Sequence, residues 1–488
     1  MRILYIDIDT LRPDHLSCYG YHRQTSPNID SLAKDGTRFE NCYVSDAPCL
    51  PSRTSLWSGQ FGFHTGVVNH GGINADMRLE GPNRAFKTRH GQNCWMSNLR
   101  KAGMKTVTFS PFGERHSAFY WYAGFNEIHN TGKSGHETAD EIMPLAIDWL
   151  DENGKKDNWF LHVNVWDPHT PFRTPLSFGE PFANDPPPSW MTEELRKQHY
   201  ESYGPHSAQD PESWGPCNTE KFPRMPATIA SMADYKKWVD GYDTGIRYAD
   251  EWVGKLLQKV RELGLYDDMV ILLSSDHGEN QGELNIYGDH HTSDHITSRV
   301  PLLMKGPGLP VNHVDRALHY QTDMAATVVE YVGQQVPKYW DGQSFLPALR
   351  EGNEAGRPSL VVSQNAWMCQ RGIRWDNWIL LRTYDTGMKD FAPLMLFDVV
   401  ADPHETKDLA AQRPDVVNEG LRILDQWVAD MMATSSSPCD PLFETLKEGG
   451  CFHVRHRLES YCQRLRETGR AQHADRLMKE YANNPMQK

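Results

Sequence analysis

The sequence predicts an α/β fold with a large, mostly parallel sheet sandwiched by helices and a smaller C-terminal α+β domain that carries a short antiparallel sheet. Three observations predict it. Short apolar runs alternate with helical patterns over the first part of the chain, which is typical of parallel sheets. After Gly352, short strand-like runs follow one another without intervening helices. A chain of 488 residues also exceeds what one core usually supports, so we expect two domains.

The first domain is predicted to span residues 1–354. Its expected strands are residues 3–9, 105–110, 158–167 and 269–276, and helical patterns occupy 139–150 and 242–263. A further helix is marked by Ser26 as N-cap, Pro27 at the first helical position and Gly36 as the stop. Ligands of such sheets bind at the carboxyl ends of the strands, where Asp9 and Asp276 stand.

Residues 173–232 interrupt this alternation with proline, serine, glycine and tryptophan. Loops of this length in a compact domain are usually functional, so we expect an insertion that forms a lid or substrate wall. The second domain is predicted to span residues 355–488. Its expected elements are strands at 360–364, 371–384 and 392–400, a helix at 417–431 and a polar helical tail.

Composition limits the classes of partner. The formal charge of −14 disfavours sequence-independent binding of nucleic acid or anionic membranes, and no apolar run approaches the roughly 20 residues of a membrane span. We find no pattern of a signal peptide and therefore expect a cytoplasmic protein. The nine cysteines lack CxxC spacing, which predicts buried thiols rather than disulfides or a zinc knuckle.

One cysteine stands in an informative context. The segment CLPSRTSLWSG, residues 49–59, fits the pattern C-x-P-S-R-x-x-L-x-x-G and resembles the type I sulfatases of the alkaline phosphatase superfamily. The resemblance implies that a maturase oxidises Cys49 to formylglycine. One hydroxyl of its hydrated aldehyde attacks sulfur, and the second then expels sulfate. Arg53, one helical turn on, would hold the diol or the oxygens around the metal.

Two other segments resemble the metal strands of that family. DIDTLRPDHLSCYGY places Asp9 at the first ligand position, and Thr10 replaces the usual second acid. Asp7, on the same face of the strand, either supplies the missing charge or supports the ligands from behind. MVILLSSDHGE places Asp276 and His277 at ligand positions. Together with the oxygen of residue 49, this set implies one divalent metal, Ca²⁺ first and Mn²⁺ as the alternative.

The groups that would hold the sulfate match the family less closely. WDPHTPF resembles a loop whose histidine touches the sulfate, which selects His169. The family lysines and the histidine of its GKWHLG motif are absent, and Arg115 and His116 are the nearest cationic replacements. Either His290 or His291 would protonate the leaving alcohol. The remaining candidates either line the pocket or only shape the loop after the nucleophile helix: His64, Asn69 and His70.

The C-terminal segment PLMLFDVVADPHETKDLA also resembles the small domain of the family, so the resemblance runs from about residue 3 to about residue 412. It implies a sulfuric ester hydrolase. A sulfated saccharide is the expected substrate, because the insertion is rich in tryptophan; glycosaminoglycan-derived sugars are one candidate. The alternatives are a phosphonate monoester or phosphodiester hydrolase with the same nucleophile, and a non-catalytic binding homologue. The oligomeric state is left open.

Overall fold

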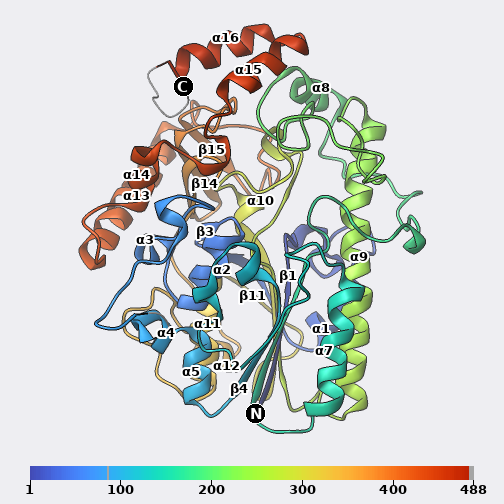
Figure 1. Ribbon diagram of the computed structural model, residues 1–488, viewed down its shortest axis with the longest axis vertical. Coiled ribbons are helices and arrows are strands. Elements are labelled where there is room, and N and C mark those ends of the chain that lie inside the picture. Colours follow the sequence, from blue (N-terminus) through green and yellow to red (C-terminus); the bar gives the residue numbers. More distant parts are fainter. Residues whose placement is uncertain (85–86, 483–488) are drawn as a thin grey trace.

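The computed structural model describes residues 1–84 and 87–482, and two sheets stand side by side in it (Figure 1). The larger sheet has eight strands in the order β11-β2-β10-β7-β1-β6-β4-β5. In chain order these are β1 Arg2–Ile8, β2 Thr37–Tyr43, β4 Lys105–Phe109, β5 Glu127–His129, β6 Trp159–Val165, β7 Val270–Ser274, β10 Arg299–Lys305 and β11 His313–Tyr320.

The sheet is parallel except at β10, which runs antiparallel to both of its neighbours, β7 and β2. The central strand β1 pairs in parallel with β6 and β7, and its Asp7 lies opposite Asn164 and Ser274. The carboxyl ends of β1 and β7 therefore meet at one edge, close to α2 (Figure 1). This is the edge at which the sequence places both metal motifs.

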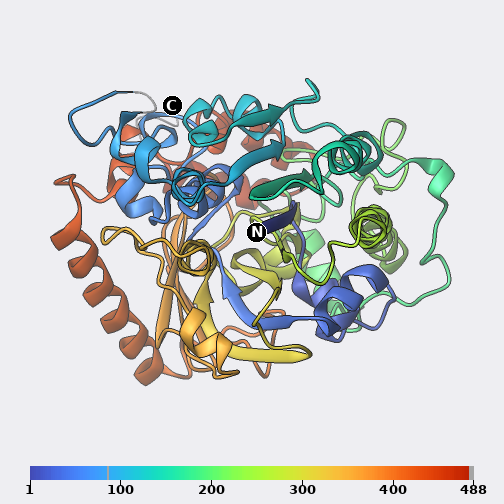
Figure 2. The same cartoon turned by 90° about the horizontal axis from the view of Figure 1, so that it is seen from below.

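Helices cover both faces of this sheet (Figure 2). On one face lie α1 Pro27–Lys34, α7 Ala139–Asn153 and α9 Met232–Glu262; on the other lie α2 Cys49–Ser58, α5 Trp95–Lys101 and α11 Gln321–Tyr331. Alternate residues of β1 enter the two cores: Leu4 and Ile6 pack toward α9, whereas Ile3 and Tyr5 pack toward α2. The apolar run of β1 thus reflects burial on both faces.

The smaller sheet is antiparallel over β12 Ser359–Gln364, β13 Cys369–Trp375, β14 Trp378–Asp385 and β15 Leu394–Asp398. A fifth strand, β3 Asp46–Ala47, joins its edge parallel to β12. The helix α13 Pro414–Thr434 packs on this sheet. Because only Pro48 separates β3 from Cys49, the small sheet helps to hold the segment that carries this cysteine.

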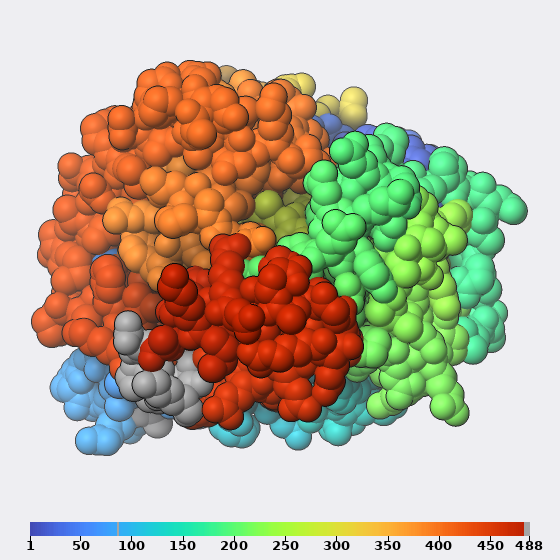
Figure 3. Space-filling model, turned by 90° about the horizontal axis from the view of Figure 1, so that it is seen from above, coloured from blue at the N-terminus to red at the C-terminus, as the bar shows by residue number. Residues whose placement is uncertain are grey.

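The remaining elements are short or lie in the insertion and the tail. They are α3 Gly62–Thr65, α4 Arg89–Asn93, α6 Phe112–Arg115, α8 Glu193–Glu201, β8 Asn280–Gln281, β9 Tyr287–Asp289, α10 His295–Ser298, α12 Leu346–Arg350, α14 Pro441–Glu448, α15 Leu458–Glu467 and α16 Ala471–Glu480. The tail, the small sheet and the insertion meet around a hollow on one face of the molecule (Figure 3). No helix in the described residues is long and apolar enough to cross a membrane.

The predicted fold class is confirmed, with differences in individual elements. Four strands of the large sheet, β2, β5, β10 and β11, were absent from the sequence prediction. Polar residues alternate along β2, and Pro301 interrupts β10, so neither looks like a buried parallel strand. The insertion at 173–232 includes α8, and α9 begins at Met232, ahead of the predicted start at residue 242.

Candidate active site

Cys49 is the first residue of α2 and is 2% exposed. Its Sγ lies 3.1 Å from His277 Nε2, and Ser52 Oγ donates a 2.5 Å hydrogen bond to the carbonyl of Asp276. The start of α2 is thereby fastened to the end of β7. Burial, together with Asp9 and Asp276, raises the pKa of the Cys49 thiol well above its usual value. The unmodified side chain is therefore a protonated thiol and a weak nucleophile.

Arg53 gathers three carboxylates behind the cysteine. Its Nε donates to Asp7 Oδ2 at 3.1 Å, and its Nη1 donates to Asp9 Oδ2 at 2.9 Å and to Asp276 Oδ2 at 2.6 Å. Burial alone would raise the pKa of Asp9, but the guanidinium outweighs it and holds that pKa well below its usual range. Burial raises the pKa of Asp276 to about 7, and the charge of Asp9 adds to the shift. The centre therefore carries more negative charge than one arginine compensates.

The residues present fit a divalent cation. Asp9, Cys49, Asp276 and His277 each offer one ligand atom, and these atoms all lie within 4.8 Å of one another. Asp9 Oδ1 is buried and has no hydrogen-bond partner among the described residues. Two carboxylates and an imidazole are ligands that a hard divalent cation accepts, and a sulfur at position 49 would suit it less well than an oxygen.

Asp7 lies beside this ligand group rather than in it. Its Oδ2 is bonded by Arg53 and lies 3.3 Å from His162 Nε2, although Oδ1 has no partner in the described part of the chain. Thr10, which replaces the usual second acid, donates its N–H to Asp276 Oδ1 at 3.3 Å. Of the two roles predicted for Asp7, this placement favours support of the ligands through Arg53.

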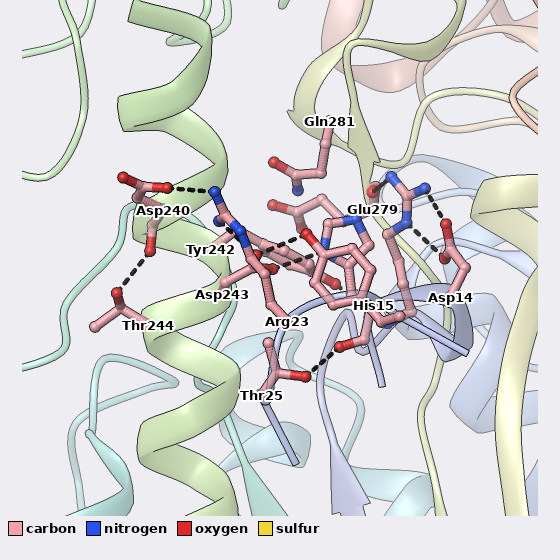
Figure 4. A network of polar contacts seen from close by, with 12 residues as sticks. Asp14, His15, Arg23, Thr25, Asp240, Tyr242, Asp243, Thr244, Glu279 and Gln281 are labelled. Carbon is pink, nitrogen blue, oxygen red and sulfur yellow. Dashed lines mark hydrogen bonds and ion pairs between the residues drawn. The ribbon is translucent and has the colours of Figure 1, made fainter. Parts of the chain in front are cut away.

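A buried polar network fixes the loop that follows β1 (Figure 4). Tyr242 Oη donates to the carbonyl of Thr10 at 2.6 Å and accepts from the N–H of Arg12 at 3.1 Å. Further along the loop, His15 Nδ1 lies 2.6 Å from Asp243 Oδ1. Both partners belong to α9, so this helix holds the loop in place next to Asp9, one of the candidate ligands.

Histidines from two further loops, His169 and His290, lie close to the candidate ligand group. The ring of His290 lies 4.0 Å from that of His277 and 5.8 Å from that of His169, centroid to centroid. Burial lowers the pKa of His169 to about 4 and that of His290 well below its usual value. The structure thus brings together the predicted sulfate-contacting histidine and one of the two predicted proton donors, both neutral in the free protein.

A family model for sulfatases matches residues 2–334. The chain belongs to the sulfatase family. Members of this family hydrolyse sulfuric esters and generally use formylglycine and a divalent metal, which agrees with the ligand group around Cys49.

Individual relatives are distant. Choline-sulfatase of Rhizobium meliloti is 25% identical over 79% of this chain and 77% of its own length. N-acetylglucosamine-6-sulfatase of Bos taurus is 23% identical over 65% of this chain and 59% of its own length. A structure solved in complex with D-glucosamine-2-N,6-O-disulfate has a TM-score of 0.67 at 19% identity and covers 88% of this chain and 98% of its own. The phosphonate monoester hydrolase of Agrobacterium radiobacter has a TM-score of 0.65 at 19% identity, covering 88% and 95%. The structural likenesses show the fold.

Other predicted residues lie in a second group of rings. The rings of His116 and His70 are 5.0 Å apart, and His70 Nδ1 lies 2.9 Å from Nε2 of His453. The ring of His291 stacks on Trp367 at 4.0 Å, and its Nε2 lies 3.1 Å from Asp289 Oδ1, the oxygen that His290 Nε2 approaches at 3.5 Å. His453 and Trp367 belong to the C-terminal part of the sulfatase, and no sequence motif marks them.

His64 does not join either group. Its Nδ1 lies 2.8 Å from Asp341 Oδ2, and its Nε2 lies 3.0 Å from Thr434 Oγ1. Nδ1 therefore joins α3 to the loop before α12, and Nε2 joins it to the end of α13, which leaves neither ring nitrogen for a substrate. Asn69 shapes its own loop, since its Oδ1 accepts from the N–H of His70 at 2.8 Å.

Arg115, the last residue of α6, lies beside the candidate site and contacts Trp166. Its Cζ lies 4.7 Å from the ring centre of Trp166, and the Cζ of Arg53 lies 5.6 Å from the same ring. Arg173, which the sequence prediction did not select, stands nearby and lowers the pKa of His169 through its charge. Its only signal in the sequence is its position four residues after His169 in a loop that resembles a family motif.

Proposed function

We propose that this sulfatase removes sulfate from a sulfated saccharide, with glycosaminoglycan-derived sugars as the first class to test. One observation carries the proposal: Cys49 starts a helix within 3.1 Å of His277 and beside two carboxylates that Arg53 holds. Relatives that are named as sulfatases of N-acetylglucosamine support the choice of a sugar.

The proposed cofactors are formylglycine at position 49, made by a maturase, and one divalent cation, Ca²⁺ in preference to Mn²⁺. Asp9, Asp276 and His277, with the oxygen of residue 49, would hold the cation. When bound, it would polarise the sulfate oxygens and favour the ionised nucleophile. The carboxylate-rich set supports Ca²⁺, and the imidazole keeps Mn²⁺ as the alternative.

The side chains around this centre have separate proposed roles. Arg53 orients the nucleophile, and His169, Arg115 and His116 contact the sulfate oxygens. His290 protonates the leaving alcohol. Its pKa is low in the free protein because of burial and neighbouring histidines, but the negative charge of a bound sulfate ester raises it and lets the ring hold the proton that it donates.

A substrate panel tests this function. The protein would be co-expressed with a maturase, and the conversion of Cys49 measured by peptide mass before assay. We expect release of sulfate from defined sulfated mono- and disaccharides, and none from a folded Cys49→Ala variant. Faster cleavage of an aryl phosphonate monoester than of any sulfate would make the chain a phosphonate hydrolase. Fully converted protein that turns over neither class would be a binding homologue.

We also propose that the protein works in the cytoplasm on short sugar fragments. All nine cysteines are free thiols, which is typical of a reducing compartment. Fractionation of the source cells, followed by immunodetection, tests the location. Recovery of the protein outside the cytoplasm would contradict it.

A further inference from the structure

Two arginines at the side of the active site lack a carboxylate partner. Arg115 ends α6 and Arg173 begins the insertion, and both are half-buried. Among residues 1–84 and 87–482, the hydrogen-bond acceptors of Arg115 are the carbonyls of Ser134 and Gly135, and Arg173 contacts the His136 ring. Neither guanidinium forms an ion pair with these described residues. Asp167 and Glu137 act on Arg173 through their charges, but neither lies within ion-pair distance of either guanidinium.

The contacts place the two guanidiniums on one short loop. Arg115 Nη1 donates to the carbonyl of Ser134 at 3.1 Å, and Arg173 Nη2 lies 3.1 Å from His136 Nδ1. Gly135 lies between these contacts, and an added Cβ there would fall 2.7 Å from Arg115 Nη1. The loop at 134–136 therefore packs against Arg115 and contacts Arg173, which holds the pair together.

The pair is shallower than the catalytic centre but continuous with it. Cys49 is 2% exposed, whereas the two arginines are half-buried and His136 is exposed. Arg115 also shares the Trp166 ring with Arg53. A substrate whose scissile sulfate reaches residue 49 would thus present another part of its sugar ring to the pair.

The two cations repel each other. Burial lowers the pKa of Arg173, and the charge of Arg115 lowers it further. An anion bound between them would relieve this repulsion, and guanidinium groups bind sulfate and carboxylate through paired hydrogen bonds.

We propose that Arg115 and Arg173 form a subsite for a second anionic substituent, sulfate or carboxylate, on the saccharide whose sulfate ester is cleaved at residue 49. This inference rests on the proposed function and specifies its substrate: a sugar that carries at least two negative groups. Arg173 is the specificity-determining residue, because Arg115 also acts on the centre itself.

Kinetics of Arg173→Gln with matched substrates test the subsite. Three versions of one sugar are compared: one sulfate only, a second sulfate, and a carboxylate beside the sulfate. We expect the wild type to prefer one of the doubly charged sugars. The variant should lose about 10- to 100-fold in kcat/KM on that sugar, mainly through KM, because a charge-assisted contact is lost. On the singly charged sugar its kcat/KM should stay within about twofold.

Two further variants serve as controls for this test. Arg173→Lys keeps the charge but loses the paired geometry, so its preference should be intermediate. Arg247→Gln removes a half-buried arginine of α9 that lies 3.9 Å from Glu251, and it should leave the preference unchanged.

Three outcomes distinguish failure of the proposed subsite from failure of the proposed function. An equal loss on singly and doubly charged sugars would show that Arg173 serves the scissile sulfate or the fold, and would overturn the subsite. A wild type that hydrolyses sulfated sugars without preferring a second anion would also overturn it, while leaving the proposed function intact. Absence of turnover on every sulfate ester by converted enzyme would instead refute the proposed function.

Discussion

At the scale of single residues, the balance of charge around Arg53 explains why the candidate metal centre suits a cation. Arg53 is 1% exposed and is shared by Asp7, Asp9 and Asp276, so one positive charge faces three carboxyl groups. The raised pKa of Asp276 reflects this excess of negative charge, because burial and the charge of Asp9 both favour its protonated form. A divalent cation would remove this excess and let every carboxyl group ionise.

Replacing Arg53 with methionine tests this balance. The variant leaves three buried carboxyl groups without their cation, so the free energy of unfolding at pH 7 should fall by about 3–5 kcal/mol. Ca²⁺ should stabilise both proteins relative to EDTA, since it binds only the folded state. Urea unfolding with either addition measures the effect. A wild type whose stability is the same in Ca²⁺ and EDTA would contradict cation binding at this centre.

His290→Gln tests the proton donor. A sugar alcohol needs protonation as it leaves, whereas a nitrophenolate leaves readily without it. The variant should therefore lose about 10²- to 10⁴-fold in kcat on a sugar sulfate and much less on 4-nitrophenyl sulfate. His291→Gln is the matched neighbour, because its ring stacks on Trp367 and is held by Asp289. If His291→Gln shows the larger selective loss, the roles of the two histidines are exchanged.

At the scale of elements, contacts near both ends fix α2. Near its start, Ser52 Oγ donates to the carbonyl of Asp276 at the end of β7. Near its end, Asp46 of β3 accepts from Ser55 Oγ at 3.1 Å and from Gly62 N–H at 2.7 Å, which ties the small sheet to α2 and α3. Gly59 then closes the helix in the left-handed region, with φ 72°. The nucleophile position thus depends on both sheets.

Gly59→Ala tests the C-terminal end of α2. An alanine Cβ would lie 2.0 Å from the ring of Trp340 and would hold a left-handed φ, so the free energy of unfolding should fall by about 2–4 kcal/mol. Gly264→Ala is the control: its φ is also positive, at 69°, but no atom lies within 4 Å of the added Cβ. Urea unfolding compares the two. Equal losses would mean that the backbone conformation alone, and not the contact with Trp340, sets the cost.

Elements with a continuous apolar run or a recognisable motif could be predicted from the sequence. The buried runs of β1 and β7 and the motif around Cys49 were of this kind, and they predicted four residues that the structure brings together: Cys49, Asp9, Asp276 and His277. Strands β2, β10 and β11 were missed because their patterns mix polar residues or proline with apolar ones, and β5 was missed because it has only three residues. Local patterns also could not show that His453 would lie beside His70, since 383 residues separate them.

At the scale of the whole molecule, distant segments close around the centre. The turn at Phe452–Val454 brings His453 to His70, and its ring also stacks on Trp367 at 4.5 Å. The insertion is joined to the small sheet's side by Lys389, whose Nζ donates to the carbonyl of Pro205. The walls of the site therefore form only when the two sheets, the tail and the insertion are assembled, which ties the shape of the site to global stability.

Lys389 makes that assembly sensitive to pH. Burial lowers the pKa of Lys389 to about 7 in the folded protein, from 10.5 in the unfolded chain. Between these values the unfolded state holds a proton that the folded state lacks, so this residue makes the free energy of unfolding rise as pH increases from about 7 toward 10.

Lys389→Met should remove that contribution: the gain in unfolding free energy between pH 7 and pH 9.5 should be smaller than in the wild type. Lys237→Met, at an exposed position of α9, should keep the wild-type gain. Urea unfolding at the two pH values measures both differences. The same gain in all three proteins would mean that Lys389 stays charged when folded, held by Asp289 against the cost of burial.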